Sequence, residues 1–301
     1  MNQLQSRENL RGITLMITAM AGFTIADSFV KAAAQNLPVG QILAIVGFFG
    51  GVIFALMTRA QGHAILSRDF FLWPVVLRNI SEILGTICYV TALSLIDLST
   101  ASAIIQATPL AVTLGATFLL NERVHWRRWS AIVVGFIGVL IILRPGGNSF
   151  ETASLWAVFG MFGLAMRDLA TRMVPQDMPT LRISTYGMTM LLPSGLLLIA
   201  LGQTPQPMSL LNWAQIIGLV MISTAGYWAI TAAMRVGDVS AVAPFRYSRI
   251  IFALIIGALV FDERPDFWLL FGAALTIAAG VYAFMRERRI ASALPSGDQA
   301  Q

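Results

Sequence analysis

Charged residues are scarce in this sequence. Asp, Glu, Lys and Arg make up 12% of its 301 residues, roughly half the share that is usual in soluble domains. Cysteine occurs once, at Cys88, which excludes a disulfide framework within the chain. The two histidines, His63 and His125, both lie in polar connections between apolar runs. Without paired acids, a nucleophile beside a base or a cluster of metal ligands, we expect no enzyme activity and no cofactor.

Apolar residues dominate instead. They make up 57% of the chain and fall into ten runs. Each run is long enough to cross a hydrocarbon core of about 30 Å at a rise of about 1.5 Å per residue. The runs are Arg11–Ala33, Pro38–Met57, Leu72–Leu95, Thr100–Leu120, Arg127–Leu143, Ser154–Met173, Leu181–Leu201, Leu211–Met234, Val239–Phe261 and Phe267–Met285. The sequence therefore predicts an all-α integral membrane protein with ten transmembrane helices in a lipid bilayer.

Most basic residues lie in the short connections, which indicates membrane topology rather than nucleic-acid binding. If the N-terminus is cytoplasmic, twelve arginines fall on the cytoplasmic side, and only Lys31, Arg144 and Arg264 fall near the outer side. Cytoplasmic loops of membrane proteins carry an excess of Lys and Arg. We therefore expect both termini to be cytoplasmic.

The chain also resembles itself at an offset of 141 residues. The matching pairs are Gly22 and Gly163, Asp27 and Asp168, Lys31 and Arg172, Pro38 and Pro179, Gly85 and Gly226, Asp97 and Asp238, Ser99 and Ser240, Glu122 and Glu263, and Arg123 and Arg264. Each half holds five predicted helices, and an odd number of crossings turns the second half upside down relative to the first. Secondary transporters use such inverted repeats, with the substrate near the midplane and access that alternates as the halves rock.

Two short motifs close the fourth and ninth runs: Asn121-Glu122-Arg123 and Asp262-Glu263-Arg264. Together with Ala107-Thr108-Pro109-Leu110 they resemble the drug/metabolite transporter superfamily, in its branch with paired EamA-type repeats. The second half departs from the pattern, because Ile250 stands where the offset puts Pro109. The resemblance covers nearly the whole chain and divides it into a first repeat at 11–146, a second repeat at 152–287 and a disordered cytoplasmic tail at 288–301.

The resemblance implies a carrier of a small polar organic metabolite in the bacterial inner membrane, driven by a proton or sodium gradient, as a monomer or homodimer. Riboflavin is the first expected substrate, because its ring carbonyls suit arginine donors. The alternatives are S-adenosylmethionine, a nucleoside-like metabolite, or export of amino acids or other metabolites. A scaffold or receptor would need no inverted repeat, and a channel fits the polar residues of the spans less well than a carrier does.

The ninth run contains two arginines, Arg246 and Arg249, near the middle of a predicted span. Each costs at least roughly 2.5–3.5 kcal/mol at that depth, and such residues usually face a bundle interior or a watery cavity. Pro244 removes a backbone donor beside them and is a candidate hinge. One interpretation is a substrate site in which Tyr247 stacks on the solute. The other is that both arginines snorkel to a nearby interface.

The third run carries Arg78, Asn79 and Glu82. Arg78 and Glu82 are four residues apart on one helical face, so they either neutralise each other or contact the substrate together with Asn79. Counting Arg78, Arg246 and Arg249 against Glu82 predicts an excess of 3 − 1 = 2 positive charges near mid-depth. Such an excess suits a carboxylate, a phosphate or a ring rich in carbonyl acceptors.

Two acid–base spacings are candidate gates. Asp27 with Lys31, and Asp168 with Arg172, are each four residues apart, and the repeat puts the pairs near opposite membrane faces. The alternative is that each base simply ends a helix by snorkelling. Asp97, just before the next predicted helix, is expected to cap it.

Aromatic and amide side chains complete the predicted site. Tyr89 and Trp228 are candidates for direct contact with the substrate, and Gln106, Tyr186 and Tyr227 for lining the pocket. The competing interpretation is packing or an interfacial belt, which is the commoner role of aromatic residues in membrane bundles.

Overall fold

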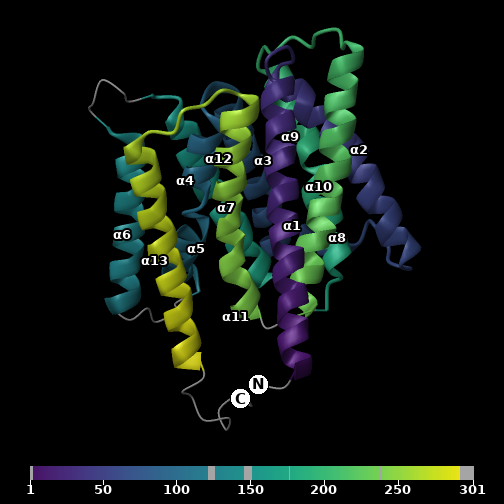
Figure 1. Ribbon diagram of the computed structural model, residues 1–301. Helices are drawn as coiled ribbons and strands as arrows, with labels where there is room; N and C mark the ends of the chain where they lie inside the picture. Colours follow the sequence, from purple (N-terminus) through teal and green to yellow (C-terminus); the bar gives the residue numbers. More distant parts are fainter. Residues whose placement is uncertain (1–2, 121–125, 146–150, 176, 237–238, 292–301) are drawn as a thin grey trace.

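The computed structural model describes residues 3–120, 126–145, 151–175, 177–236 and 239–291. Within these ranges all regular secondary structure is helical, and Figure 1 shows a bundle of helices that run roughly side by side. The elements are α1 (Gln3–Ala33), α2 (Val39–Ala60), η1 (Arg68–Phe71), α3 (Trp73–Leu95), α4 (Leu98–Ile105), α5 (Thr108–Leu119), α6 (Trp126–Leu143), α7 (Ser154–Met173), α8 (Thr180–Thr189), α9 (Leu191–Ala200), α10 (Leu210–Val236), α11 (Val239–Val242), η2 (Ala243–Ser248), α12 (Arg249–Val260) and α13 (Phe267–Ala291).

The described helices make the ten predicted crossings. Nine segments are long and apolar enough to span a membrane. The tenth crossing is α7, which has 20 residues but carries Arg167, Asp168 and Arg172 in its last two turns. Three crossings consist of shorter helices in succession: α4 with α5, α8 with α9, and α11 with η2 and α12. The predicted all-α membrane fold is confirmed.

Prolines account for these interruptions. Proline lacks an amide hydrogen, and its ring clashes with the preceding turn of a helix. Pro109 lies in the first turn of α5, so the carbonyl of Ile105 accepts from Thr108 Oγ1 at 2.5 Å instead of from a backbone amide. Pro193 lies in the first turn of α9, and Pro244 lies in the first turn of η2. The fourth and ninth crossings, which the repeat relates to each other, are therefore both broken inside the bundle.

Glycines set the closest helix contacts, and they recur in the two halves. In the structure α1 packs against α10, and α3 packs against α7. A Cβ added to Gly163 of α7 would lie 2.5 Å from Gly85 Cα on α3. A Cβ added to Gly22 of α1 would lie 3.6 Å from Gly226 Cα on α10. The 141-residue offset exchanges these two glycine pairs, so the contacts are equivalent positions of the inverted repeat that the sequence predicts.

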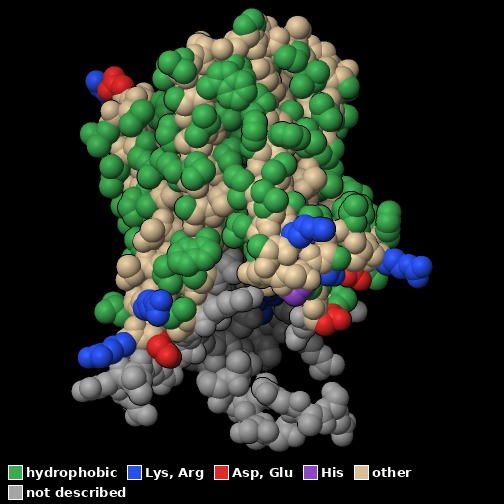
Figure 2. Space-filling model, turned by 90° about the vertical axis from the view of Figure 1, so that its right-hand side faces the viewer, with side chains coloured by type: hydrophobic (Ala, Val, Ile, Leu, Met, Phe, Trp, Pro, Cys, Tyr) green, Lys and Arg blue, Asp and Glu red, His purple; other side chains and the backbone are tan. Residues whose placement is uncertain are grey.

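The two ends of the bundle differ in how many basic side chains they expose on the flank drawn in Figure 2. The N- and C-termini lie at one end, and residues 202–209 between α9 and α10 lie at the other (Figure 1). Figure 2 shows hydrophobic side chains over most of one flank, with basic side chains gathered mainly toward the end of the termini. Exposed Arg59 and Arg68, at the end of α2 and in η1, belong to that end. An apolar flank with charges at its margins is what a bundle embedded in a bilayer requires.

The last helix is longer than its apolar run. α13 continues to Ala291, so the first residues of the predicted tail at 288–301 are helical. Residues 292–301 lie outside the described part of the chain.

Candidate functional site

A cluster of three side chains joins the two repeats inside the bundle. Asp27 of α1 accepts from Arg249 Nη2 at 2.5 Å and from the Tyr89 hydroxyl at 3.1 Å, and Arg249 Nη2 lies 3.2 Å from the same hydroxyl. Asp27 and Tyr89 belong to the first repeat, whereas Arg249 is the first residue of α12 in the second. Arg249 therefore has an acidic partner after all, on a helix more than 200 residues away in sequence.

Aromatic rings enclose the same guanidinium. Its central carbon lies 5.7 Å from the centre of the Tyr89 ring and 6.0 Å from the centre of the Phe23 ring. Arg249 Nε is buried and has no hydrogen-bond partner among the described residues. One N–H group of this guanidinium is therefore left without a partner among the described residues.

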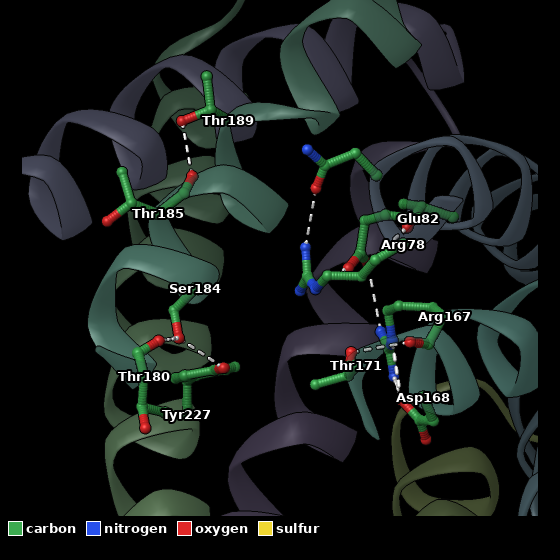
Figure 3. Close-up of polar contacts among 12 residues, drawn as sticks. Arg78, Glu82, Arg167, Asp168, Thr171, Thr180, Ser184, Thr185, Thr189 and Tyr227 are labelled. Atoms are coloured by element: carbon green, nitrogen blue, oxygen red, sulfur yellow. Dashed lines mark hydrogen bonds and ion pairs between the residues drawn. The ribbon is translucent and has the colours of Figure 1, made fainter. Parts of the chain in front are cut away.

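Four more charges lie on α3 and α7, as Figure 3 shows. One oxygen of Glu82 is 3.2 Å from Arg78 Nη2, and the other is 3.2 Å from Arg167 Nη1. Arg167 also bonds Asp168 at 2.8 Å. Arg78 and Glu82 are buried, and the other two are half-buried. The predicted pair of Arg78 with Glu82 is present, but the sequence analysis assigned no partner to Arg167.

Arg78 extends from α3 to α8. A side chain at Gly187 of α8 would collide with the Arg78 guanidinium, so this glycine makes room for it. Arg78 Nη1 donates to Asn79 Oδ1 at 3.2 Å, while the Asn79 amide nitrogen is buried without a partner among the described residues. Figure 3 places hydroxyl groups of α8 across from this charged cluster, including Ser184, whose Oγ lies 2.6 Å from the Tyr227 hydroxyl.

The interruptions of the fourth and ninth crossings meet each other. Gln106, directly after α4, donates from its side-chain amide to the carbonyl of Arg246 in η2 at 3.4 Å. Both α5 and α12 therefore begin inside the bundle. Transporters build substrate sites from discontinuous helices of this kind, because their ends offer unpaired backbone groups at mid-membrane.

Other predicted site residues lie away from the two charged clusters. The Arg246 side chain is exposed and forms no ion pair with a described residue. The Tyr247 hydroxyl fills the space beside Gly280 on α13, where a side chain would overlap it. Trp228 is 60% exposed. The rings that lie over Arg249 are Tyr89 and Phe23, and the substrate roles of Arg246, Tyr247 and Trp228 stay predictions.

A separate group of contacts ties the repeats together at the end opposite the termini. The Glu263 carboxylate accepts from the Leu98 amide at 2.6 Å, the Ser99 amide at 3.0 Å and the Ser99 hydroxyl at 2.6 Å. Lys31 Nζ lies 3.6 Å from Glu263 and donates to the Ile96 carbonyl at 2.5 Å. We call Lys31, Leu98, Ser99 and Glu263 the Glu263 latch. It joins α1 and α4 of the first repeat to the loop after α12 of the second.

The backbone after α12 directs Glu263 into this position. Asp262 adopts a positive φ of 53°, which is uncommon for a residue other than glycine. The Glu263 amide then bonds back to the Gly257 carbonyl at 2.9 Å. A side chain at Gly257 would collide with the Glu263 carboxylate, so this glycine provides the space that the latch needs.

The latch corrects the predicted role of Asp97. Asp97 occupies the N-cap position of α4 but makes no side-chain capping bond, because Glu263 already accepts from the first amides of that helix. Partial burial and the nearby charge of Glu263 raise the pKa of Asp97, while Lys31 opposes this shift. Asp97, at the start of α4, therefore lies near two further carboxylates, Glu263 and Glu151, with Lys31 as the nearby base.

The two candidate gates are not paired as their spacing suggested. Asp27 bonds Arg249, whereas Lys31 contacts Glu263. Asp168 bonds its neighbour Arg167, and the Arg172 side chain is exposed. Tertiary partners from other helices or the adjacent residue compete with the i+4 neighbour for each acid. The repeat equivalents of Glu263 and Asp97, which are Glu122 and Asp238, lie outside the described residues.

The sequence analysis missed Arg167 and the role of Glu263. The spacing of four residues favoured Arg172 as the partner of Asp168. Arg167 lies inside an apolar run, and any charge in such a position is a candidate site residue. Glu263 was noted only as part of a motif, and its partners are far away in sequence. Among the described residues, no group of three His, Cys, Asp or Glu could hold a metal ion.

One family model matches the chain twice, once in each half. The model of the "EamA-like transporter family" matches residues 10–144 and again residues 151–285. A solved crystal structure shares the fold at a TM-score of 0.62 and 21% identity, over 95% of this chain and 99% of that chain.

Three similar proteins are named as transporters or as an exporter. The "Riboflavin transporter" of Vibrio cholerae is 29% identical over 94% of this chain and 98% of its own. The "S-adenosylmethionine uptake transporter" of Rickettsia prowazekii is 25% identical over 93% of this chain and 94% of its own. The "Pseudopaline exporter CntI" of Pseudomonas aeruginosa is 28% identical over 90% of this chain and 92% of its own.

Proposed function

Because this chain belongs to the EamA-like transporter family, we propose that it is a secondary active carrier of a small polar organic solute in the bacterial inner membrane. The proposal includes no catalytic step and no cofactor. Its central support is the cluster of Asp27, Tyr89 and Arg249, in which a second-repeat arginine is held by first-repeat side chains. A polar site between inverted repeats is where such carriers bind substrate.

Alternating access requires the contacts between the two repeats to break at one end of the bundle at a time. The Glu263 latch ties α4 to the loop after α12 at the end opposite the termini. If the repeats rock about the central cluster, these contacts separate and open that end to the solute. Pro244, which interrupts the ninth crossing at η2, is the proposed hinge. Lys31 acts in the latch as a gate residue.

Riboflavin is the solute that we propose first. Two relatives carry the name riboflavin transporter, from Vibrio cholerae and from Rhizobium johnstonii. A flat ring with carbonyl acceptors matches the unpaired Arg249 Nε and the Tyr89 ring beside it, because guanidinium donors bind carbonyls and both groups stack on a ring. Asn79, which has a free amide nitrogen, adds a donor from the second cluster.

A nucleoside-like solute is the second candidate. Relatives from Rickettsia are named S-adenosylmethionine uptake transporters, and adenine also stacks on aromatic rings. Export of a metabolite is the third, because one relative is named a pseudopaline exporter. The second candidate is a solute that is taken up, and the third is one that is exported, so the direction of transport helps to separate them.

Uptake by purified protein in proteoliposomes tests the proposal. We expect labelled riboflavin to enter vesicles that contain the wild-type protein and to be competed by unlabelled riboflavin. Arg249→Lys keeps the charge but loses the planar fork, so uptake should fall while the amount of folded protein holds. The loss of one charge-assisted contact costs about 1.5–3 kcal/mol in affinity.

Arg59→Lys is the matched control, because Arg59 is exposed at the end of α2. It should leave uptake unchanged. Equal uptake by wild type, Arg249→Lys and Arg59→Lys would remove Arg249 from the substrate site. Failure of riboflavin together with uptake of S-adenosylmethionine would select the second candidate.

A further inference from the structure

The buried and half-buried charges of the two clusters balance each other. Three guanidiniums and three carboxylates are involved: Arg78, Arg167 and Arg249 with Asp27, Glu82 and Asp168. Every member lies within 3.2 Å of an opposite charge. We call these six residues the charge core. Its formal charge is 3 − 3 = 0, which replaces the excess of two positive charges expected from the sequence.

The two clusters are connected through α3. Glu82 and Tyr89 are seven residues apart, so they lie on the same face of α3 about two turns from each other. The guanidiniums of Arg167 and Arg249 are also close enough to repel each other. A solute that binds beside Arg249 therefore lies in the combined field of both clusters.

Among the described ion pairs, no other charged side chain joins a member of the charge core. Lys31 and Glu263 pair with each other in the latch. Arg246 stands outside the charge core because its side chain is exposed and bonds none of the six. In the low dielectric of a bundle interior, an added charge without a counter-ion is costly.

From this balance we propose that the charge core selects solutes without net charge. The inference rests on the proposed function, because it assigns a specificity to the same site. It favours riboflavin over S-adenosylmethionine, whose sulfonium and ammonium groups against one carboxylate give it a net positive charge. Asp27 is the determining residue: it is the acid that neutralises Arg249, and only Tyr89 shares it among the described contacts. Removing the Asp27 charge leaves the core at +1 and converts it into a site for an anion.

Riboflavin and its 5′-phosphate, flavin mononucleotide, form a matched pair of probes. They share the ring, but the phosphate adds about −1.5 to −2 charges at pH 7. Binding to purified protein in detergent is measured by quenching of flavin fluorescence, so no transport is needed. The wild-type protein should bind riboflavin at least about 100-fold more tightly than the phosphate.

Three variants test the role of the charge. Asp27→Asn should improve the affinity for flavin mononucleotide relative to riboflavin by at least about tenfold. The double variant Asp27→Asn with Arg249→Gln is neutral again and should return to excluding the phosphate. Asp177→Asn makes the same change in an exposed loop and should leave the preference of the wild type unchanged.

A further variant covers the case in which Asp27→Asn does not fold, as judged by size-exclusion chromatography. Asp168→Asn adds the same charge to the core at a half-buried position and should shift the preference in the same direction. Equal binding of the two flavins by the wild type would overturn the proposal. So would equal shifts in Asp27→Asn and Asp177→Asn.

The same comparison separates the two proposals. If neither flavin binds but adenosine does, riboflavin is wrong as the substrate. The affinities for adenosine and for its monophosphate then test the charge rule, which is the proposed selection of solutes without net charge. Preference for adenosine over the monophosphate supports the rule. Equal binding of that pair, or no binding of any of the four probes, overturns it.

Discussion

At the residue scale, the partners of the buried charges explain the polar interior. Arg249 lies between Asp27 and two aromatic rings, and Glu82 bridges Arg78 and Arg167 with its two oxygens. Removing one member of such a group leaves an opposite charge buried and unpaired, which costs far more than the pair itself contributes. Each member therefore has to be tested together with its partners.

Glu82→Gln should lower the yield of folded protein, because Arg78 and Arg167 are then left with Asp168 alone. The loss in stability should be about 3–5 kcal/mol, as for other broken buried pairs. The double variant Arg78→Gln with Glu82→Gln removes one charge of each sign and leaves Arg167 bonded to Asp168. It should recover more monodisperse protein than Glu82→Gln in detergent extracts. Equal yields of both variants and the wild type would show that the pair is not structural.

Asp97→Asn should stabilise the protein in a pH-dependent way. The pKa of Asp97 is raised in the folded protein by partial burial and by Glu263. The folded state therefore disfavours the ionised form, and this destabilisation is absent at low pH and grows as the pH rises through the pKa. The Tm of Asp97→Asn in detergent should exceed that of the wild type at pH 8, and the difference should shrink as the pH falls toward the ordinary pKa of Asp, about 3.9. A gain in Tm that keeps the same size as the pH falls would contradict this explanation.

At the scale of helices, the repeat offers a matched pair of mutations. Gly163→Ala puts a Cβ 2.5 Å from Gly85 Cα, between backbones that have no side chain to move aside, whereas Gly22→Ala at the equivalent position meets Gly226 Cα only at 3.6 Å. Overpacking typically costs about 1–3 kcal/mol. Gly163→Ala should lower the Tm markedly, and Gly22→Ala should change it little. A similar fall in both variants would mean that the two crossings are packed alike.

The Glu263 latch makes a prediction about access. Glu263→Gln loses the charge that holds Lys31 and caps α4, so the end opposite the termini should open more often. Ser102 is the fifth residue of α4 and is fully buried. Changed to cysteine in a Cys88→Ala background, it reports whether water reaches this part of the bundle. A water-soluble maleimide should label Ser102→Cys several times faster in the presence of Glu263→Gln.

Asp266→Asn is the control for this experiment. Asp266 lies three residues after Glu263 and pairs with Arg144 rather than with the latch. It should leave the labelling rate of Ser102→Cys unchanged. If Asp266→Asn accelerates labelling as much as Glu263→Gln does, the effect reflects general loosening of that end and not the latch.

At the scale of the whole molecule, the arrangement of the two ends predicts membrane sidedness. Thr204 and Gln61 are exposed at opposite ends of the bundle, and the excess of arginines in the connections predicts that the end of Gln61 is cytoplasmic. With Cys88 replaced, an impermeant thiol reagent added to intact cells should label Thr204→Cys but not Gln61→Cys. Labelling of Gln61→Cys alone would invert the proposed orientation.

The sequence by itself determined the number of crossings, their approximate ends, the inverted repeat and the family. These properties follow from local patterns: an apolar run of fixed minimum length, a proline that breaks a helix, and a constant offset between matching residues. The pair of Arg78 with Glu82 was also predictable, because both residues lie on one helical face four positions apart.

Only the tertiary structure decided which opposite charges meet. Asp27 bonds Arg249 rather than approaching Lys31, and Glu263 caps a helix that already has Asp97 at its N-cap position. Neither partner could be chosen from the sequence, because the contacts depend on how close α1, α4 and α12 approach after folding. In a bundle interior every buried charge has to find a counter-charge, and which one is within reach is a matter of three-dimensional distance rather than of spacing along the chain.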